Sequence, residues 1–166
     1  MNMVSCYRSP IGFLLLSADE YGLTGLQFAD KPIFPQREQP EAPAIHAAMR
    51  WLDIYFSGKV PDFTPPLHPT GTPFQMEVWE ILHAIPYGRT VTYGEIANRI
   101  AARRGLPKMS AQAVGGAVGR NKIGIIIPCH RVIGTDRRLT GYSAGLDKKI
   151  KLLQLEGIKF ELMEPR

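Results

Sequence analysis

Cysteine is scarce in this chain: its 166 residues include two, Cys6 and Cys129. Two cysteines cannot build the disulfide framework of a small secreted domain, and no cluster of cysteines has the ligand spacing of a zinc site. The histidines His46 and His68 of the first half have no ligand spacing either. We therefore expect no metal and a reducing, cytoplasmic location, in which a free thiol stays reactive.

Long hydrophobic runs are missing as well. No apolar stretch approaches the ~20 residues of a membrane helix, and the first residues lack the basic-then-apolar pattern of a signal peptide. The sequence thus predicts no membrane contact. The length fits one compact unit or two small lobes, and we expect a monomer.

Positive charge is concentrated in the second half of the chain. Residues 1–85 contain five Lys or Arg and nine Asp or Glu, a net charge of −4, whereas residues 86–166 contain fifteen and six, a net charge of +9. Such asymmetry indicates that the second half meets a polyanion, most simply a nucleic acid. A solvated basic surface without a partner is the alternative.

The first half has the pattern of a small scaffold. Short apolar runs separated by turns such as SPIG (9–12) predict an antiparallel sheet, and residues 44–56 have the apolar period of a helix. Proline-rich stretches flank this helix, at 31–43 before it and at 60–72 after it. We interpret residues 1–70 as a scaffold domain with a proline-rich linker, and residues 71–166 as a second domain.

Three helix starts in the second half are marked by capping residues. Thr72 is followed three residues later by Gln75, and Thr92 by Glu95, so each pair can form a capping box, and Ser110 can cap a third helix. The helices that begin after Thr92 and Ser110 are joined by a short Gly/Pro turn. This arrangement predicts a helix-turn-helix motif.

The helix predicted over 111–119 consists almost entirely of Ala, Gly and Val, and Gln112 is its one long polar side chain. Its three glycines weaken a helix by roughly 1 kcal/mol each relative to Ala. Either these small residues pack tightly against a neighbouring helix, or they let the backbone approach DNA closely without sequence preference. A last helix is predicted over 146–155.

Residues 125–133 combine branched aliphatic side chains with a possible reactive group, and we predict a strand buried on both faces. Pro128 donates no backbone N–H, so the strand would be interrupted at Cys129 and expose its sulfur. A free cysteine usually only packs in a core. Here the flanking Pro128, His130 and Arg131 make Cys129 a candidate nucleophile, although contact with His130 requires that the backbone bend after Pro128.

Several segments carry a family resemblance: GRTVTYGEIA (88–97), AVGGA (113–117), Asn121, PCHRV (128–132), GYSAGL (141–146), and Lys149 with LLQLEG (152–157). Together they resemble the O6-alkylguanine-DNA alkyltransferases, which repair alkylated guanine by direct reversal. The resemblance covers residues 73–157 and extends weakly into the first half. It implies an α/β (α+β) fold: a small N-terminal antiparallel sheet with a helix, of ribonuclease H-like type, and a mainly helical C-terminal domain with a winged helix-turn-helix-like DNA-binding motif.

The resemblance also implies the chemistry. Cys129 would accept the alkyl group after activation by a relay in which a water bridges the thiol to His130 and Glu156 orients the imidazole. Tyr93 would protonate guanine as it leaves, and Arg131 would be structural. S-alkyl-Cys129 is not hydrolysed, so each molecule would act once, as a suicide methyltransferase without a cofactor. The plain alternatives are a solvated helix end for Glu156 and a packing role for Tyr93.

The expected partner is double-stranded DNA with an alkylated guanine, bound through the minor groove with little sequence preference. The damaged base would be flipped into a pocket, where Tyr142 covers the alkyl group and Ser143 donates to O6. The carbonyls of Val132 and Cys129 would receive the exocyclic amine, and Asn121 would act as a hinge. The remaining residues implied to bind DNA or substrate are Ala113, Gly115, Gly116, Arg120 and Lys149.

Two features depart from the family pattern. The recognition helix usually carries an Arg that fills the space left by the flipped base, whereas this chain has Gln112, which brings no charge. The segment 101–109 is also longer than in the human-type pattern. Neither change removes the chemistry, but both affect affinity and lesion range, and acceptance of O4-alkylthymine or bulky adducts stays open.

Two other functions remain as alternatives. One is a lesion-sensing DNA-binding protein of alkyltransferase-like type, with weak or no transfer because of Gln112, although such proteins lack the acceptor that Cys129 provides. The other is a Cys–His hydrolase, which would release its product and turn over many times. For the hydrolase, the sequence contains no clear oxyanion loop and no sequence-distant His partner.

Overall fold

The computed structural model describes residues 2–35, 39, 42–134, 139 and 141–158. The chain forms two compact units: unit 1 takes in residues 1–70 and 122–126, and unit 2 takes in residues 71–121 and 127–166. The first boundary falls within the predicted proline-rich linker. The return of residues 122–126 to unit 1 has no counterpart in the sequence pattern.

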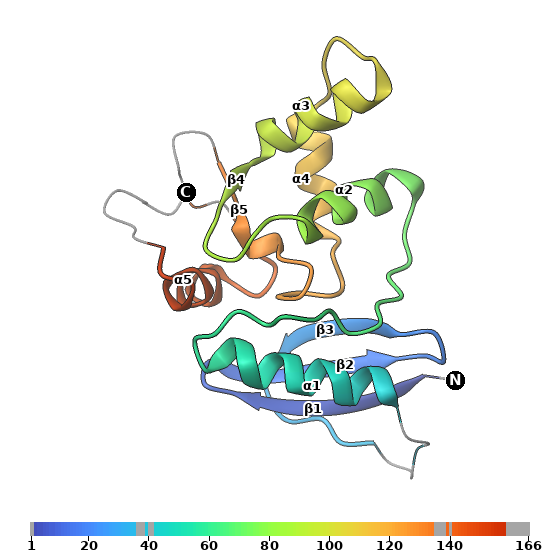
Figure 1. Ribbon diagram of the computed structural model, residues 1–166, viewed down its shortest axis with the longest axis vertical. Helices are drawn as coiled ribbons and strands as arrows, with labels where there is room; N and C mark the ends of the chain where they lie inside the picture. The colour runs from blue at the N-terminus through green and yellow to red at the C-terminus, as the bar shows by residue number, and fades with distance from the viewer. Residues whose placement is uncertain (1, 36–38, 40–41, 135–138, 140, 159–166) are drawn as a thin grey trace. The chain divides into compact units, whose positions relative to one another are not determined.

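Unit 1 is a three-stranded sheet with one helix. The strands β1 (Met3–Ser9), β2 (Gly12–Ala18) and β3 (Leu23–Ala29) are antiparallel and lie in the order β1-β2-β3. The helix α1 (Pro43–Phe56) lies across one face of the sheet and contacts all three strands (Figure 1). Alternate residues of β2 face this helix and are fully buried, as the period of a half-buried strand requires. The predicted sheet and helix are therefore confirmed.

The outer edge of β3 is covered by two short segments of the same unit. The Leu26 N–H donates to the Lys122 carbonyl at 2.9 Å, and the Gly124 N–H donates to the Leu26 carbonyl at 2.8 Å. At the other end of β3, the Leu23 N–H donates to the Pro66 carbonyl at 2.8 Å. These bonds satisfy polar groups that an uncovered edge strand would leave open for another chain. Residues 122–126 thus complete the sheet of unit 1.

The described residues of unit 2 form four α-helices, and the predicted caps are present. The bounds of the helices are α2 (Pro73–His83), α3 (Tyr93–Arg104), α4 (Ala111–Gly119) and α5 (Leu146–Leu155). The side chains of Thr72, Thr92 and Ser110 each accept a hydrogen bond from the backbone N–H three residues later, and the first two form complete capping boxes. Within the described residues, no helix is long and apolar enough to cross a membrane.

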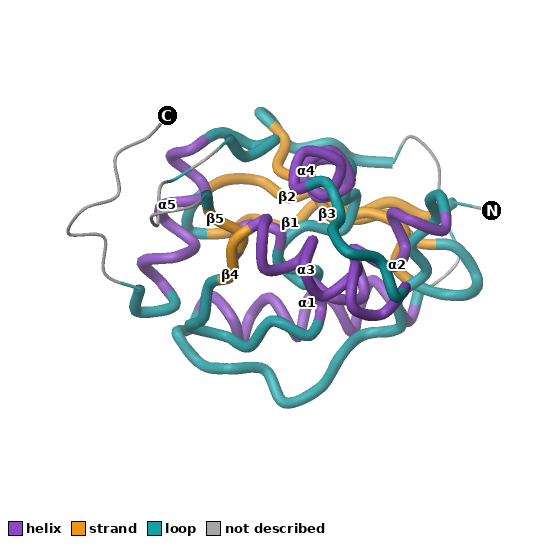
Figure 2. The backbone as a smooth tube through the Cα atoms, turned by 90° about the horizontal axis from the view of Figure 1, so that it is seen from above, coloured by secondary structure: helices purple, strands orange, loops and turns teal. Residues whose placement is uncertain are grey.

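Two very short strands join the ends of distant segments in unit 2. β4 (Val91–Thr92) precedes α3, and β5 (Val132–Ile133) follows the cysteine segment; the two pair in parallel and lie side by side (Figure 2). This pairing brings the start of α3 close to the residues around Cys129. It therefore positions Tyr93, the first residue of α3, near the sulfur.

The strand predicted over residues 125–133 is present only at its end, as β5 (Val132–Ile133), whereas the interruption predicted at Cys129 is confirmed. Residues 122–126 belong to unit 1, and Cys129–Arg131 forms one turn of 3₁₀-helix, η1, before the short β5. The Arg131 N–H donates to the Pro128 carbonyl at 3.0 Å, and the Cys129 N–H to the Ile127 carbonyl at 2.8 Å. Pro128 cannot donate to a sheet, and the bend that follows it spreads successive side chains around a turn instead of alternating them.

The glycine-rich helix α4 is held in place from α2 by Trp79. The ring nitrogen of Trp79 donates to the Ala117 carbonyl at 2.9 Å, and the indole is 3% exposed. Phe74, near the start of α2, is half-buried, whereas Trp79 belongs to the buried core. This buried hydrogen bond fixes a helix that has few side chains of its own to anchor it.

Candidate active site

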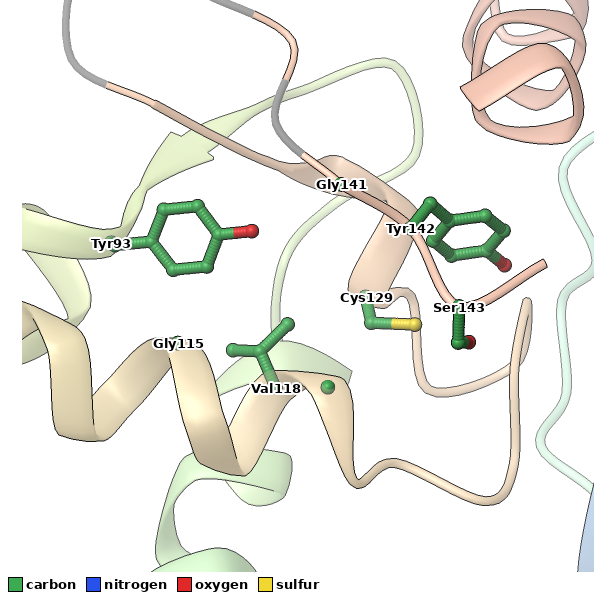
Figure 3. A pocket seen from close by; sticks show the side chains of 8 residues that line it. Tyr93, Gly115, Val118, Cys129, Gly141, Tyr142 and Ser143 are labelled. Atoms are coloured by element: carbon green, nitrogen blue, oxygen red, sulfur yellow. The ribbon is translucent and has the colours of Figure 1, made fainter. Parts of the chain in front are cut away.

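Cys129 begins η1 and lies at the base of a small pocket in unit 2. The pocket has a volume of about 70 Å³, and the cysteine is 8% exposed. The Tyr93 hydroxyl points from α3 towards the side of the pocket that carries Cys129 and Tyr142 (Figure 3). The residues that line the pocket are Tyr93, Gly115, Val118, Gly119, Cys129, Gly141, Tyr142 and Ser143.

The surroundings of the Cys129 sulfur act on its pKa in opposite directions. Burial raises the pKa of the thiol, because a thiolate loses its hydration. Hydrogen bonds from the side chains of Asn121 and Tyr142, and the positive charge of Lys149, lower the pKa. The Asn121 amide also donates to the Ile127 carbonyl at 2.8 Å, which fixes its orientation. The site therefore holds a buried thiol with groups ready to stabilise its anion.

Lys149 lies in the interior beside the thiol. Its side chain is fully buried, and its ammonium donates to the Val132 carbonyl at 2.7 Å. Burial lowers the pKa of Lys149 to about 8, and the attraction of the Cys129 thiolate acts against that shift. The resemblance included Lys149 among the residues that bind DNA or substrate. The structure gives it no exposed surface for a phosphate and makes it a charge partner of the sulfur.

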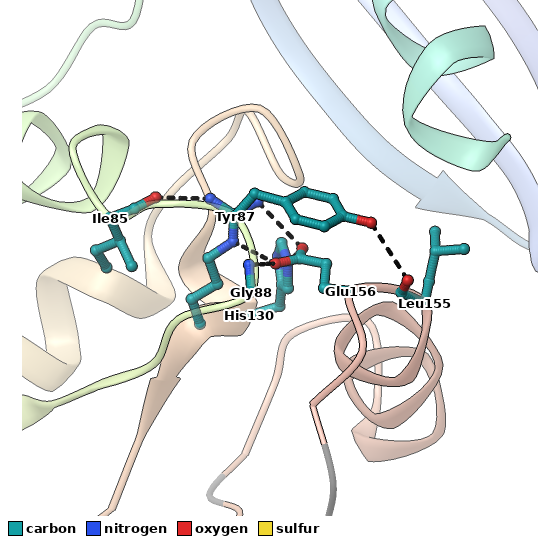
Figure 4. A network of polar contacts seen from close by, with 7 residues as sticks. Ile85, Tyr87, Gly88, His130, Leu155 and Glu156 are labelled. Carbon is teal, nitrogen blue, oxygen red and sulfur yellow. Dashed lines mark hydrogen bonds and ion pairs between the residues drawn. The ribbon is translucent and has the colours of Figure 1, made fainter. Parts of the chain in front are cut away.

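His130 and Glu156 form a buried pair behind the cysteine. The Nε2 atom of His130 is 2.6 Å from Oε2 of Glu156, and both side chains are inaccessible to solvent. The carboxylate also accepts hydrogen bonds from the Gly88 N–H at 2.9 Å and from the Arg131 guanidinium at 2.8 and 3.1 Å (Figure 4). Within the described residues, Nδ1 of His130 is a buried polar atom without a hydrogen-bond partner.

The pKa shifts of the pair have identifiable causes. Burial alone would raise the pKa of Glu156, but hydrogen bonds and charges from His130 and Arg131 outweigh burial and lower it to about 2. Burial lowers the pKa of His130; Glu156 opposes this shift, and Arg131 and Lys149 add to it. Glu156 is therefore a carboxylate and His130 a neutral imidazole near pH 7. Because a carboxylate can only accept, the His130 proton lies on Nε2.

The outer face of α4 carries most of the residues implied to meet DNA. Gln112, Ala113 and Gly116 are exposed on it, and Arg120 is exposed directly after it. A Cβ atom added at Gly116 would meet nothing within 4 Å, and one at Gly115 would lie 3.7 Å from the Tyr93 ring, an ordinary contact. Packing inside unit 2 thus does not require these glycines. The explanation that they allow close approach of another molecule is the one the structure favours.

Residues 73–158 match the family described as 6-O-methylguanine DNA methyltransferase, DNA binding domain, and residues 3–69 match its ribonuclease-like domain. The chain belongs to the 6-O-methylguanine DNA methyltransferase family. The predicted family and its mixed α/β fold are therefore confirmed.

Relatives in this family span nearly the whole chain. A methylated-DNA–protein-cysteine methyltransferase of Methanosarcina acetivorans is 48% identical over 91% of this chain and 96% of its own length. A methylated-DNA–protein-cysteine methyltransferase of Haemophilus influenzae is 44% identical over 93% of this chain and 86% of its own length. The solved Mycobacterium tuberculosis protein in complex with DNA is 42% identical, with a TM-score of 0.77 over 92% of this chain and 91% of that one.

The 6-O-methylguanine DNA methyltransferase site contains groups that the sequence did not single out. Val118, Gly119 and Gly141 line the pocket, and the Gly88 N–H binds Glu156. A backbone N–H carries no sequence signal, so Gly88 could not have been identified in that role. Residues 135–138 and 140, which precede the GYSAGL segment (141–146), lie outside the described residues. Among the described residues, no group of three or more His, Cys, Asp or Glu could hold a metal ion.

Proposed function

We propose that this protein repairs O6-alkylguanine in double-stranded DNA by moving the alkyl group irreversibly to Cys129. The observation that carries the proposal is the buried thiol at the base of a pocket, with Asn121, Tyr142 and Lys149 stabilising its anion. The names of relatives more than 40% identical over most of the chain support the same activity. The names of these relatives give no support to the alternative of a Cys–His hydrolase.

The transfer is a single displacement. The thiol proton passes to Nδ1 of His130 through a water molecule, and the Glu156 carboxylate stabilises the imidazolium that forms. A sulfur lone pair then attacks the alkyl carbon, so that the S–C bond forms while the bond from carbon to O6 breaks and its electron pair remains on guanine. Tyr93 protonates the leaving guanine and regains a proton from the imidazolium. Cys129 becomes a thioether, which ends activity after one turnover.

The pocket residues would recognise the flipped base. Tyr142 covers the alkyl group, Ser143 donates to O6, and the carbonyls of Val132 and Cys129 accept from the exocyclic amine. The half-buried Tyr142 and exposed Ser143 both line the pocket, which supports these roles. The base must leave the duplex to reach a sulfur that is 8% exposed.

The face of α4 is the proposed contact with the minor groove. Its open glycine positions let a backbone come close, Arg120 supplies a charge for phosphate, and Asn121 connects the helix to the cysteine segment. Such contacts discriminate little between base sequences. This suits a protein that must bind damaged bases at any position in DNA. We further propose that one copy acts alone, in the cytoplasm.

Intact mass measurement tests the function. After incubation with a duplex containing O6-methylguanine, we expect the mass of one added methyl group per molecule, in the peptide that contains Cys129. The methylated protein should give no second transfer when fresh duplex is added. An unchanged mass together with bound DNA would replace the proposal with lesion sensing.

Replacing Gln112 with Arg is expected to speed reaction with duplex substrate. Gln112 is exposed at the start of α4, and a guanidinium could pair with the orphaned cytosine through a charged hydrogen bond. Such a bond exceeds a neutral one by about 1 kcal/mol, which predicts roughly a fivefold faster single-turnover rate.

The matched control is Gln154→Arg, which adds the same charge at an exposed position of α5. Reaction of either variant with the free base O6-benzylguanine, which needs no flipping, should stay at the wild-type rate. Slower duplex repair by Gln112→Arg would mean that glutamine is adapted to this pocket and not merely tolerated.

A further inference from the structure

Arg131 is bound more tightly than a packing role requires. Its Nε and Nη2 atoms donate to the two oxygens of Glu156 at 2.8 and 3.1 Å, and its Nη1 atom donates to the Ile85 carbonyl at 2.7 Å. The guanidinium also lies over the Tyr87 ring, 5.7 Å from its centroid. The side chain is 7% exposed. Arg131 therefore has one orientation, and its charge is directed at Glu156.

Glu156 is thus shared by two side chains that can carry positive charge. His130 reaches Oε2 at 2.6 Å, and the Arg131 fork holds both carboxylate oxygens. An arginine is always protonated in a protein. One carboxylate already neutralised by Arg131 attracts a proton on His130 much less than an unpaired carboxylate would, and the two cations would repel each other at short range.

We propose that Arg131 is a positioning residue that keeps His130 neutral, with its proton on Nε2, so that Nδ1 remains a basic lone pair. This inference rests on the proposed function, in which Nδ1 receives the thiol proton. Without Arg131, part of the His130 population would become an imidazolium beside the Glu156 carboxylate, and an imidazolium can no longer accept a proton. The succession of Cys129, His130 and Arg131 along η1 then has a chemical reason.

Other charged groups act on the same pair and set the expected size of the effect. Lys149, on α5, also disfavours a charged His130. A negative charge on the neighbouring Cys129 would act in the opposite direction, because unlike charges attract. Burial and the charge of Glu156 raise the pKa of Tyr87, and the charge of Arg131 lowers it. Burial and the charge of Arg131 also lower the pKa of His83, at the end of α2. Since Lys149 remains when Arg131 is removed, we expect a partial and not a complete conversion to imidazolium.

The test measures ring ¹⁵N resonances of histidine-labelled protein against pH, without substrate. In the wild type we expect His130 protonated on Nε2 alone at pH 7. Arg131→Gln should raise the His130 midpoint by about one pH unit or more, and Arg131→Lys, which keeps the charge, should leave it near the wild-type value. The exposed His46 of unit 1 provides the internal reference and should not move.

The outcomes separate the inference from the function. A doubly protonated His130 in the wild type at pH 7, or an unchanged midpoint in folded Arg131→Gln, overturns the role of Arg131. If Arg131→Gln does not fold, the protonation state of His130 in the wild type and the His130 midpoint in Arg131→Lys still test the role of Arg131. Because the resonances need no methyl transfer, a failed transfer assay with the expected shifts would reject the function alone.

Discussion

Cys129→Ala is expected to abolish alkyl transfer completely while leaving binding to an O6-methylguanine duplex intact. The sulfur is the proposed acceptor, and alanine offers no lone pair to the alkyl carbon. The proposed DNA contacts, Gln112 and Arg120 among them, lie on the exposed face and end of α4 and do not include the sulfur. Intact mass measures transfer, and fluorescence anisotropy of a labelled duplex measures binding.

Cys6→Ala is the matched control for this experiment. Cys6 is half-buried in β1 of unit 1 and, with Cys129, makes up the cysteine content of the chain. The Cys6 variant should gain one methyl group as the wild type does. Methylation of the Cys129→Ala protein would contradict the assignment of Cys129 as the acceptor. A Cys6→Ala protein that stays unmodified would indicate that the acceptor is Cys6, in unit 1.

Glu156→Gln should lower both the stability of unit 2 and the rate of transfer. The substitution leaves the buried Arg131 without its carboxylate and His130 without its orienting acceptor. Removing one partner of a buried ion pair costs roughly 3–5 kcal/mol in the free energy of unfolding. Urea denaturation measures that loss, and Glu95→Gln, at an exposed capping-box position of α3, should cost far less.

The same carboxylate predicts a pH dependence with a definite sign. The pKa of Glu156 falls from 4.5 to about 2 in the folded protein, so its contribution to stability is complete above about pH 4.5 and is lost as the pH falls towards 2. The loss over this interval is about 3 kcal/mol. Glu156→Gln should lack this part of the acid destabilisation, and an identical acid profile in wild type and variant would contradict it.

The transfer rate of the Glu156 variant gives an independent check of the relay. If Glu156 stabilises the imidazolium that forms on His130, the folded variant should react more slowly and its rate should depend differently on pH. A pH profile of transfer that is unchanged by Glu156→Gln would count against the relay even if the stability loss is found.

The amino-acid sequence by itself determined the local structure of unit 2. Thr72, Thr92 and Ser110 cap the helices that the sequence predicts, because each side chain accepts from the backbone N–H three residues later and needs no distant partner. The motif around Cys129 and the small residues of α4 also indicated the family without a structure. Each of these signals is complete within a few residues of chain.

Only the tertiary structure decided how the site is assembled. Pro128 predicted an interruption at Cys129, but only the structure shows that a 3₁₀ turn forms there and that residues 122–126 belong to unit 1. The Gly88 N–H meets Glu156 across 68 residues of sequence, and Lys149 is buried beside a thiol it does not adjoin in the chain. Such polar contacts form only after segments distant in sequence have come together. Burial then removes water from the polar groups, and each of them needs a hydrogen-bond partner within the protein.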